Sequence, residues 1–374
     1  MSALYVSRRS SNPCSLLQNS DNAPGIVTAI LAGRGLHTVT DHEIFELGDV
    51  ILQRGATLRD AQLAYKTYGT LNREKSNAVV YPTRFGGRHT DNEWLIGPGM
   101  ALDPSEYFVI VPNMLGNGLS SSPSNTPPPY GKARFPRVTV HDNVRAQHRL
   151  VTERFDIEKL VLVTGYSMGA QQTFQWGVSY PKMVERMLPF CGSARTSTHN
   201  FVFLEGVKAA LTADAAFEDG WCDVPPTTGL RAFARVYAGW ALSQSFYREG
   251  VHLEQGYSSL EDYLIAFWEG NYVAKDANDL LAMIWTWQHA DIGATPDFGG
   301  SLEAALGAIE AKATVMPGET DLYFPVKDNE YEVSRMPNAE LRPIPSIWGH
   351  FAGSGRNPED VRFIDDALKE LLGA

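Results

Sequence analysis

Residues Leu160-Val-Leu-Val-Thr-Gly-Tyr-Ser-Met-Gly169 place a serine between an apolar run and a helical segment. Leu160–Thr164 predicts a buried strand, and Ala170–Tyr180, which stops before a proline, predicts a helix. A G-x-S-x-G turn between strand and helix holds its serine in a strained, exposed position, where the hydroxyl can meet a substrate. The two glycines are needed because side chains there would collide with the neighbouring strand and helix. The stretch predicts Ser167 as a nucleophile, with an ordinary turn carrying a surface serine as the alternative.

Further strands and helices are predicted on both sides of this turn. Upstream, short apolar runs predict strands at Phe45–Leu52, Gln62–Tyr68, Asn77–Tyr81 and Tyr107–Val111. The first two follow each other directly and suggest an antiparallel start. Downstream, the predicted elements are a helix at Leu302–Ala311, a strand at Ala313–Met316, a helix at Val326–Arg335, a strand at Glu340–Ile344 and a helix at Pro358–Leu372. The pattern predicts the α/β-hydrolase fold, with a mostly parallel central sheet and helices on both faces.

A tryptophan-rich segment with helical spacing interrupts this series of α/β elements. It carries five tryptophans and helical patterns such as Leu230–Tyr247 and Asp276–His289. We therefore expect an N-terminal extension at 1–44, an α/β-hydrolase core at 45–192 and 295–374, and a helical lid at 193–294. Residues 1–40 contain three arginines and several serines, so a targeting segment is an alternative there to a poorly ordered terminus.

The composition restricts the classes of partner. The formal net charge of −11 leaves no broad basic surface to neutralise phosphates, which argues against nucleic acid. Cys14, Cys191 and Cys222 are too scattered for a disulfide framework, and no cluster has zinc-ligand spacing. No apolar run reaches the roughly 18 residues that a membrane span needs. We expect a soluble cytoplasmic protein that acts on a small-molecule acyl substrate without a metal or a bound cofactor.

A serine hydroxyl becomes a good nucleophile when a histidine takes its proton and a carboxylate orients that histidine. In this fold the acid follows a late strand, where Asp321 lies, with Glu319 as its rival. The histidine follows the last strand, and His350 is the one histidine there, since the other eight precede Asp321. We therefore predict Ser167, Asp321 and His350 as a catalytic triad, with a solvated loop acid and a buried structural histidine as the alternatives.

Two backbone N–H groups are expected to bind the oxyanion of an acyl-transfer reaction. The first is that of Met168, directly after the serine. The second comes from the loop after the third strand, Pro82-Thr-Arg-Phe-Gly-Gly87, where we place it at Arg84, with Thr83 and Phe85 as alternatives. A tight glycine turn without this role is the other interpretation.

Several further segments carry a family likeness. They are Ala64-Tyr-Lys-Thr-Tyr-Gly-Thr-Leu-Asn72, Tyr107-Phe-Val-Ile-Val-Pro-Asn-Met-Leu-Gly116, Phe135-Pro-Arg-Val-Thr-Val-His-Asp142, Gly165-Tyr-Ser-Met-Gly169, Asp276-Ala-Asn-Asp-Leu-Leu281 and Asp321-Leu-Tyr-Phe-Pro325. From about Phe45 to the C-terminus, the chain resembles the homoserine O-acetyltransferase family. The resemblance implies a helical lid over a deep pocket, a Ser/Asp/His triad, an acyl-enzyme formed by ping-pong chemistry, and homodimers built through the lid.

The chain departs from the family pattern in three places. The elbow is Gly165-Tyr-Ser-Met-Gly-Ala170 where the family has GGSMGG, Lys208 stands where the lid arginine for the substrate carboxylate is expected, and Phe351 replaces the acid after the catalytic histidine. That acid is expected to pair with the amino group of homoserine, a charge-assisted contact worth roughly 1.5–3 kcal/mol. Its loss disfavours homoserine as the acceptor.

These observations favour hydrolysis of a small ester or amide through an acyl-enzyme. One alternative is an O-acyltransferase that moves an acyl group from acetyl-CoA or another thioester to the hydroxyl of a small acceptor. A noncatalytic binding protein on the same fold is the remote alternative. Tyr166, Phe351 and the lid tryptophans would shape an apolar pocket, with core packing as the alternative. Lys208 would attract a substrate carboxylate, with a surface lysine as the alternative.

Overall fold

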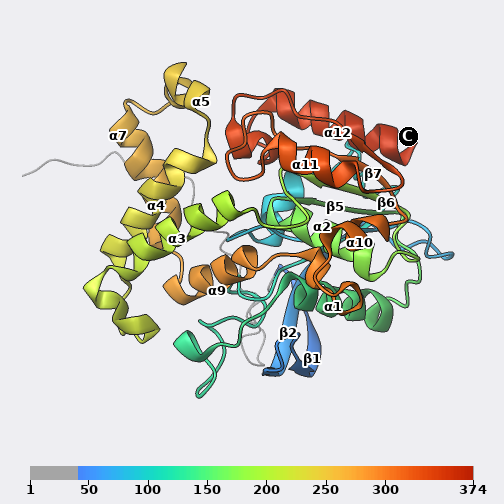
Figure 1. Ribbon diagram of the computed structural model, residues 1–374, viewed down its shortest axis with the longest axis horizontal. Coiled ribbons are helices and arrows are strands. Elements are labelled where there is room, and N and C mark those ends of the chain that lie inside the picture. Colours follow the sequence, from blue (N-terminus) through green and yellow to red (C-terminus); the bar gives the residue numbers. More distant parts are fainter. Residues whose placement is uncertain (1–40, 374) are drawn as a thin grey trace, which may run out of the picture. The chain divides into compact units, whose positions relative to one another are not determined.

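An eight-stranded sheet forms the centre of the computed structural model, which describes residues 41–373 (Figure 1). Residues 1–40, for which we expect a poorly ordered terminus or a targeting segment, lie outside the described residues, as does Cys14. In the order β1-β2-β4-β3-β5-β6-β7-β8, the strands are Glu43–Ile51, Thr57–Tyr68, Phe108–Pro112, Ala78–Val80, Leu162–Tyr166, Arg186–Phe190, Lys312–Val315 and Ala339–Leu341. β1 and β2 are antiparallel, β2 joins β4 antiparallel, and the remaining pairs are parallel. The predicted antiparallel start and mostly parallel sheet are confirmed.

Helices cover both faces of the sheet because successive strand residues point to opposite sides. Val163 of β5 belongs to the same buried cluster as Trp176 of α2 (Met168–Ser179). Its neighbour Leu162 belongs instead to the cluster of Leu368 in α12 (Pro358–Leu372). The first cluster also contains residues of α1 (Val140–Arg149) and α10 (Leu302–Gly307). The alternation explains why the central strands are apolar on both faces.

β6, at Arg186–Phe190, is the strand that the sequence did not predict. It lies in the middle of the sheet between β5 and β7, and Pro189 pairs in register with Gly165. Proline cannot donate a ladder hydrogen bond and normally argues against a central strand. Here the Pro189 carbonyl still accepts a hydrogen bond of 3.0 Å from the Met316 N–H, so β6 remains hydrogen-bonded to the chain on the β7 side.

Short helices fill the span between β6 and β7 and gather at one side of the sheet, at the left of Figure 1. They are α3 (Thr198–Thr212), α4 (Thr227–Ala241), α5 (Gln244–Arg248), α6 (Val251–Glu254), α7 (Leu260–Tyr263), α8 (Gly270–Val273) and α9 (Ala277–Gln288). The single helix predicted at Leu230–Tyr247 is two helices. The break occurs because the Ser243 hydroxyl accepts from the Phe246 N–H and caps a new helix.

The C-terminal helix has the bounds that the sequence predicts. The Asn357 side chain caps α12, Pro358 occupies its first turn, and Gly373 ends it with φ +79°. α11 (Val326–Val333) precedes β8 and leads from the loop that contains Asp321.

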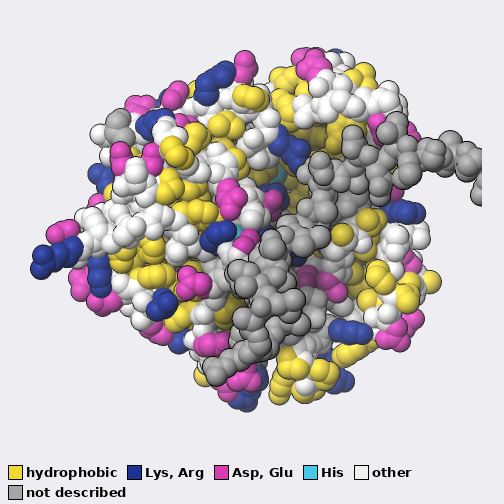
Figure 2. Space-filling view, turned by 180° about the vertical axis from the view of Figure 1, so that it is seen from behind, with side chains coloured by type: hydrophobic (Ala, Val, Ile, Leu, Met, Phe, Trp, Pro, Cys, Tyr) yellow, Lys and Arg dark blue, Asp and Glu magenta, His cyan; other side chains and the backbone are white. Residues whose placement is uncertain are grey.

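The described surface mixes charges of both signs. On the face drawn in Figure 2, the Lys and Arg side chains of the described residues are interspersed with Asp and Glu. None of the helices within residues 41–373 has the length and apolar character to cross a membrane.

Candidate active site

Ser167 lies at a sharp turn between the end of β5 and the start of α2. Its backbone has φ +60° and ψ −123°, a conformation that a non-glycine residue adopts only under strain. A Cβ added at Gly165 would lie 2.3 Å from the Gly169 carbonyl oxygen, and one at Gly169 would lie 2.7 Å from the Pro82 carbonyl oxygen. Both glycines are thus required for the close approach of strand, helix and loop, as the sequence predicts.

Ala170, where the related family has glycine, packs against Gly192 at the end of β6. A Cβ built on Gly192 would lie only 2.4 Å from the Ala170 Cβ. The extra methyl group of Ala170 is therefore accommodated by the absence of a side chain at Gly192.

Ser167, His350 and Asp321, which are far apart in the sequence, meet at this turn. The His350 Nε2 atom lies 2.9 Å from the Ser167 Oγ atom, and the His350 Nδ1 atom lies 2.7 Å from the Asp321 Oδ2 atom. A carboxylate only accepts hydrogen bonds, so Nδ1 is the donor, and in the neutral imidazole Nε2 is then the acceptor. This tautomer leaves Nε2 able to take the proton of the serine hydroxyl.

The Asp321 carboxylate is buried and accepts hydrogen bonds from two backbone N–H groups as well as from His350. Its Oδ1 atom accepts from the Tyr323 N–H at 2.7 Å and the Phe324 N–H at 3.2 Å. Glu319, the rival acid, is exposed to solvent and has no hydrogen bond to His350. Of the two acids, only Asp321 reaches the histidine.

Aromatic rings enclose the His350 imidazole. The Tyr166 ring stacks on it with centroids 4.9 Å apart, and the Tyr323 and Phe324 rings lie 4.6 and 5.6 Å away. The Tyr166 hydroxyl also donates to the His350 backbone carbonyl at 3.0 Å. Burial raises the pKa of the Tyr166 hydroxyl well above its ordinary value, so it remains a neutral donor. These contacts fix the orientation of the imidazole.

The expected oxyanion donors lie on both sides of Ser167. Met168 is the first residue of α2, so its N–H has no partner within the helix and lies at the positive end of the helix dipole. On the other side, the Thr83 N–H is already bonded to the Pro112 carbonyl at 3.2 Å, which removes Thr83 from the three alternatives. Arg84 and Phe85 both line the cavity beside Ser167, so these two residues stay as the alternatives for the second donor.

A buried polar chain ties the two donor segments together. The Gln172 side-chain amide donates to the carbonyl oxygens of Thr83 and Met168, at 2.9 and 3.0 Å. Its own oxygen accepts from Gln147 at 2.6 Å, and Gln147 accepts from the Trp176 indole N–H at 2.8 Å. A hydrogen bond from one side chain to both segments fixes the distance between the two expected donors.

A small cavity of about 270 Å³ opens above Ser167 and His350. Its buried walls are aromatic, and Tyr166, Tyr237, Trp268 and Tyr272 line it. Burial raises the pKa of the Tyr237 and Tyr272 hydroxyls well above the ordinary value, so these walls are uncharged. Space of this size suits a small molecule.

The three residues predicted to bind substrate do not all lie at the cavity. Tyr166 and Phe351 line the cavity, and the Phe351 ring packs 5.5 Å from that of Trp268. Lys208 does not line it. It lies on α3, paired with Glu205, and faces a separate hollow beside Trp285. The structure therefore does not support the prediction that Lys208 contacts the substrate, because its side chain lines that hollow and not the cavity above Ser167.

Most of the other side chains that line the cavity were not singled out from the sequence as individual site residues. Tyr237, Trp268, Tyr272 and Lys275 all come from the mostly helical segment between β6 and β7, where no motif marks individual positions. Arg356 follows His350 by six residues, and its position next to the predicted histidine was the one available signal.

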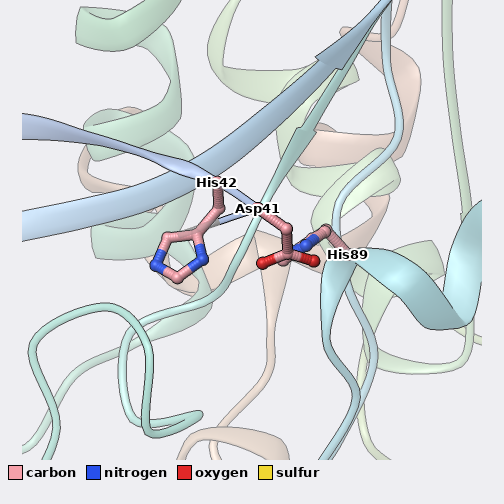
Figure 3. Close-up of side chains that lie close together, drawn as sticks. All are labelled: Asp41, His42 and His89. Atoms are coloured by element: carbon pink, nitrogen blue, oxygen red, sulfur yellow. The ribbon is translucent and has the colours of Figure 1, made fainter. Parts of the chain in front are cut away.

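Figure 3 shows a separate set of potential metal-ligating side chains, Asp41, His42 and His89. The ring centroids of His42 and His89 are 5.6 Å apart. The His89 Nδ1 atom lies 3.1 Å from the amide nitrogen of Asn113. None of the three residues lines the Ser167 cavity, so we assign them no role in its chemistry.

Comparisons with known proteins show what the chain is similar to. Residues 84–353 match the family model described as the alpha/beta hydrolase fold. The ethyl acetate hydrolase of Pseudomonas veronii is 40% identical over 344 residues, which cover 90% of this chain and 98% of that protein. The homoserine O-acetyltransferase of Chlorobaculum parvum is 31% identical over 316 residues, 80% of this chain and 87% of that protein. The solved structure of the acetyl esterase MekB superposes with a TM-score of 0.87 at 40% identity, covering 89% of this chain and 97% of that one.

Proposed function

Because the chain belongs to the α/β-hydrolase family, as a divergent relative of the homoserine O-acetyltransferases, we propose that it hydrolyses short-chain esters of small alcohols, above all acetyl esters. The hydrogen-bonded series from Ser167 through His350 to Asp321, at the floor of a small aromatic cavity, carries this proposal. The 40% identity to an ethyl acetate hydrolase and to an acetyl esterase supports the choice of substrate class.

The first half of the proposed reaction forms an acyl-enzyme. The Ser167 Oγ atom attacks the ester carbonyl while His350 Nε2 takes its proton. The carbonyl oxygen becomes negative and accepts hydrogen bonds from the Met168 N–H and from the N–H of Arg84 or Phe85. When the carbonyl re-forms, the bond to the alcohol oxygen breaks. His350 then donates its proton to that oxygen, and the alcohol leaves.

The second half consumes water. His350 Nε2 takes a proton from a water molecule as its oxygen attacks the acyl carbon. The bond to Ser167 Oγ breaks, the serine recovers a proton from His350, and the carboxylic acid leaves. Asp321 stays ionised throughout and stabilises the imidazolium that forms in each half. Every step uses groups of this chain, the ester and water.

Acyl transfer to an alcohol is the second candidate, favoured by the likeness to homoserine O-acetyltransferases. In that reaction acetyl-CoA or another thioester would acylate Ser167, and the hydroxyl of a small acceptor would replace water. Two observations count against homoserine itself as the acceptor. Phe351 offers no carboxylate to its amino group, and Lys208 lies outside the cavity.

The test follows acetate release from ethyl acetate and p-nitrophenyl acetate, with and without a panel of alcohols that includes homoserine, for wild type and Ser167→Ala. A steady release of acetate that is unchanged by the alcohols supports the hydrolase, provided that Ser167→Ala abolishes it. A burst followed by turnover only with an alcohol identifies a transferase. A fluorophosphonate that adds one label to wild type and none to Ser167→Ala checks the nucleophile. If neither wild type nor Ser167→Ala is labelled and neither turns over an ester, the result would favour a noncatalytic binding protein.

A further inference from the structure

The mouth of the Ser167 cavity has the opposite charge to the chain as a whole. Arg84, Lys275 and Arg356 line it together with a single carboxylate, Asp91. Three cations against one anion leave an excess of positive charge at this opening, whereas the chain carries a formal net charge of −11. A local field of this sign attracts anions.

Among the residues that the structure describes, two of these cations have no carboxylate partner. The Lys275 ammonium donates to the Gly86 backbone carbonyl at 2.8 Å, and the Arg356 guanidinium lies over the Phe267 ring, 4.5 Å from its centroid. Within residues 41–373, no Asp or Glu oxygen lies within 4.0 Å of either group. Asp91 approaches Arg84 instead, at 3.7 Å. The charges of Lys275 and Arg356 are therefore available to a ligand.

The cavity is graded from an apolar floor to a charged rim. Tyr166, Tyr237 and Trp268 are buried, whereas Lys275 is half-buried and Arg356 is exposed. Burial, together with the nearby charge of Arg84, lowers the pKa of Lys275. The ammonium thus lies where water solvates it poorly and where a carboxylate would stabilise it.

The position of Ser167 decides which end of an ester meets this rim. The acyl carbon must reach the Ser167 Oγ atom, and the aromatic walls beside it offer an apolar surface to a short acyl group. The alcohol part extends toward the opening, where it also departs after the acyl-enzyme forms. A charged group on the alcohol would reach the rim, whereas one on a short acyl group would lie in the apolar part and be poorly solvated.

We propose that the preferred substrates are acetyl esters whose alcohol part carries a carboxylate, which Lys275 and Arg356 bind at the cavity mouth. This inference rests on the esterase function proposed above and names its substrate class. Charge-assisted hydrogen bonds from a lysine and an arginine to a carboxylate provide the selectivity.

The experiment compares two esters of nearly equal shape and leaving group, 4-acetoxybutanoate and its neutral amide, 4-acetoxybutanamide. The quantity measured is the ratio of their kcat/KM values, which cancels any general loss of activity in a variant. We expect wild type to prefer the carboxylate by about tenfold or more, with a preference that falls as salt rises. Arg356→Gln and Lys275→Met should each lower the ratio, and the double variant should bring it close to one.

A matched control and a second variant keep the test decisive. Lys182→Met removes the same charge from an ammonium whose side chain is 82% exposed, outside the cavity, and should leave the ratio unchanged. Arg356→Gln keeps the Lys275 bond to Gly86, so it tests the rim without disturbing that loop. Equal kcat/KM values for the two esters in wild type, or a preference that survives both substitutions, would overturn the inference while the esterase function stands. Failure to hydrolyse either ester would count against the esterase function itself.

Discussion

The Tyr166 hydroxyl donates a hydrogen bond of 3.0 Å to the backbone carbonyl of His350, while its ring stacks on the imidazole of the same residue. Tyr166 is also the residue before Ser167, at the end of β5. One side chain therefore links the strand that presents the serine to the loop that presents the histidine. The distance between Ser167 Oγ and His350 Nε2 depends on both.

Tyr166→Phe should lower kcat by about tenfold with little change in KM, because one buried carbonyl loses a hydrogen bond worth about 1 kcal/mol and the imidazole loses its anchor. Steady-state kinetics with p-nitrophenyl acetate measure both constants. Tyr331→Phe removes a hydroxyl from a tyrosine that is 44% exposed on α11 and serves as the control. A larger effect on KM than on kcat would assign Tyr166 to substrate binding instead.

Asp321→Asn should lower kcat by about 10⁴-fold, since an amide favours the wrong tautomer of His350 and cannot stabilise its cation. Glu319→Gln, two residues away and exposed, should retain wild-type kcat. Circular dichroism on both variants separates lost activity from lost fold. If the two substitutions were equally harmful, the assignment of the acid to Asp321 would fail.

Gln172→Met should lower kcat by roughly tenfold, because the amide that joins the Thr83 and Met168 carbonyls would be lost and the two oxyanion donors would no longer be held at a fixed distance. Gln175→Met is the matched control. It lies on the same helix, is also buried, and bonds to Ser179 and Thr295 instead. We expect the two variants to lower the melting temperature by similar amounts. Only Gln172→Met should also lower kcat. Equal kcat values would show that the polar chain serves stability only.

The stability of the protein should depend on pH through Glu332, whose pKa burial raises from 4.5 to about 8. The folded state keeps this proton up to about pH 8, whereas the unfolded chain loses it near its ordinary value, so the folded state binds more protons in that window. The contribution of Glu332 to the free energy of unfolding therefore falls as pH rises from about 5 to 8.

Glu332→Gln cannot titrate, so its free energy of unfolding should fall less over the same window. Urea titrations at several pH values measure the difference in slope between the variant and wild type. Glu330→Gln, an exposed neighbour on α11, should keep the wild-type slope. Parallel curves for wild type and Glu332→Gln would mean that Glu332 does not hold its proton in the folded state.

How well the sequence predicted each feature depends on how local the feature is. The strand, turn and helix around Ser167 are encoded by adjacent residues, and the bounds of α12 follow from its own cap residues, Asn357, Pro358 and Gly373. β6 was missed because Pro189 lowers the strand propensity of five residues that the neighbouring strands bury regardless. Lys208 was predicted as the counterpart of the family's lid arginine, and a matching position in the sequence does not determine which cavity the side chain lines.

By itself, the sequence determined the fold class and the order of serine, acid and histidine, since periodicity, glycine positions and chain order are properties of a one-dimensional pattern. Only the tertiary structure decided between Asp321 and Glu319, removed Thr83 from the oxyanion alternatives, and placed Lys275 and Arg356 at one rim with Ser167 below them. The physical reason is that hydrogen bonds and charge interactions act over a few ångströms. Which groups come within that distance depends on how the lid helices pack against the sheet, and no local segment of the chain specifies that packing.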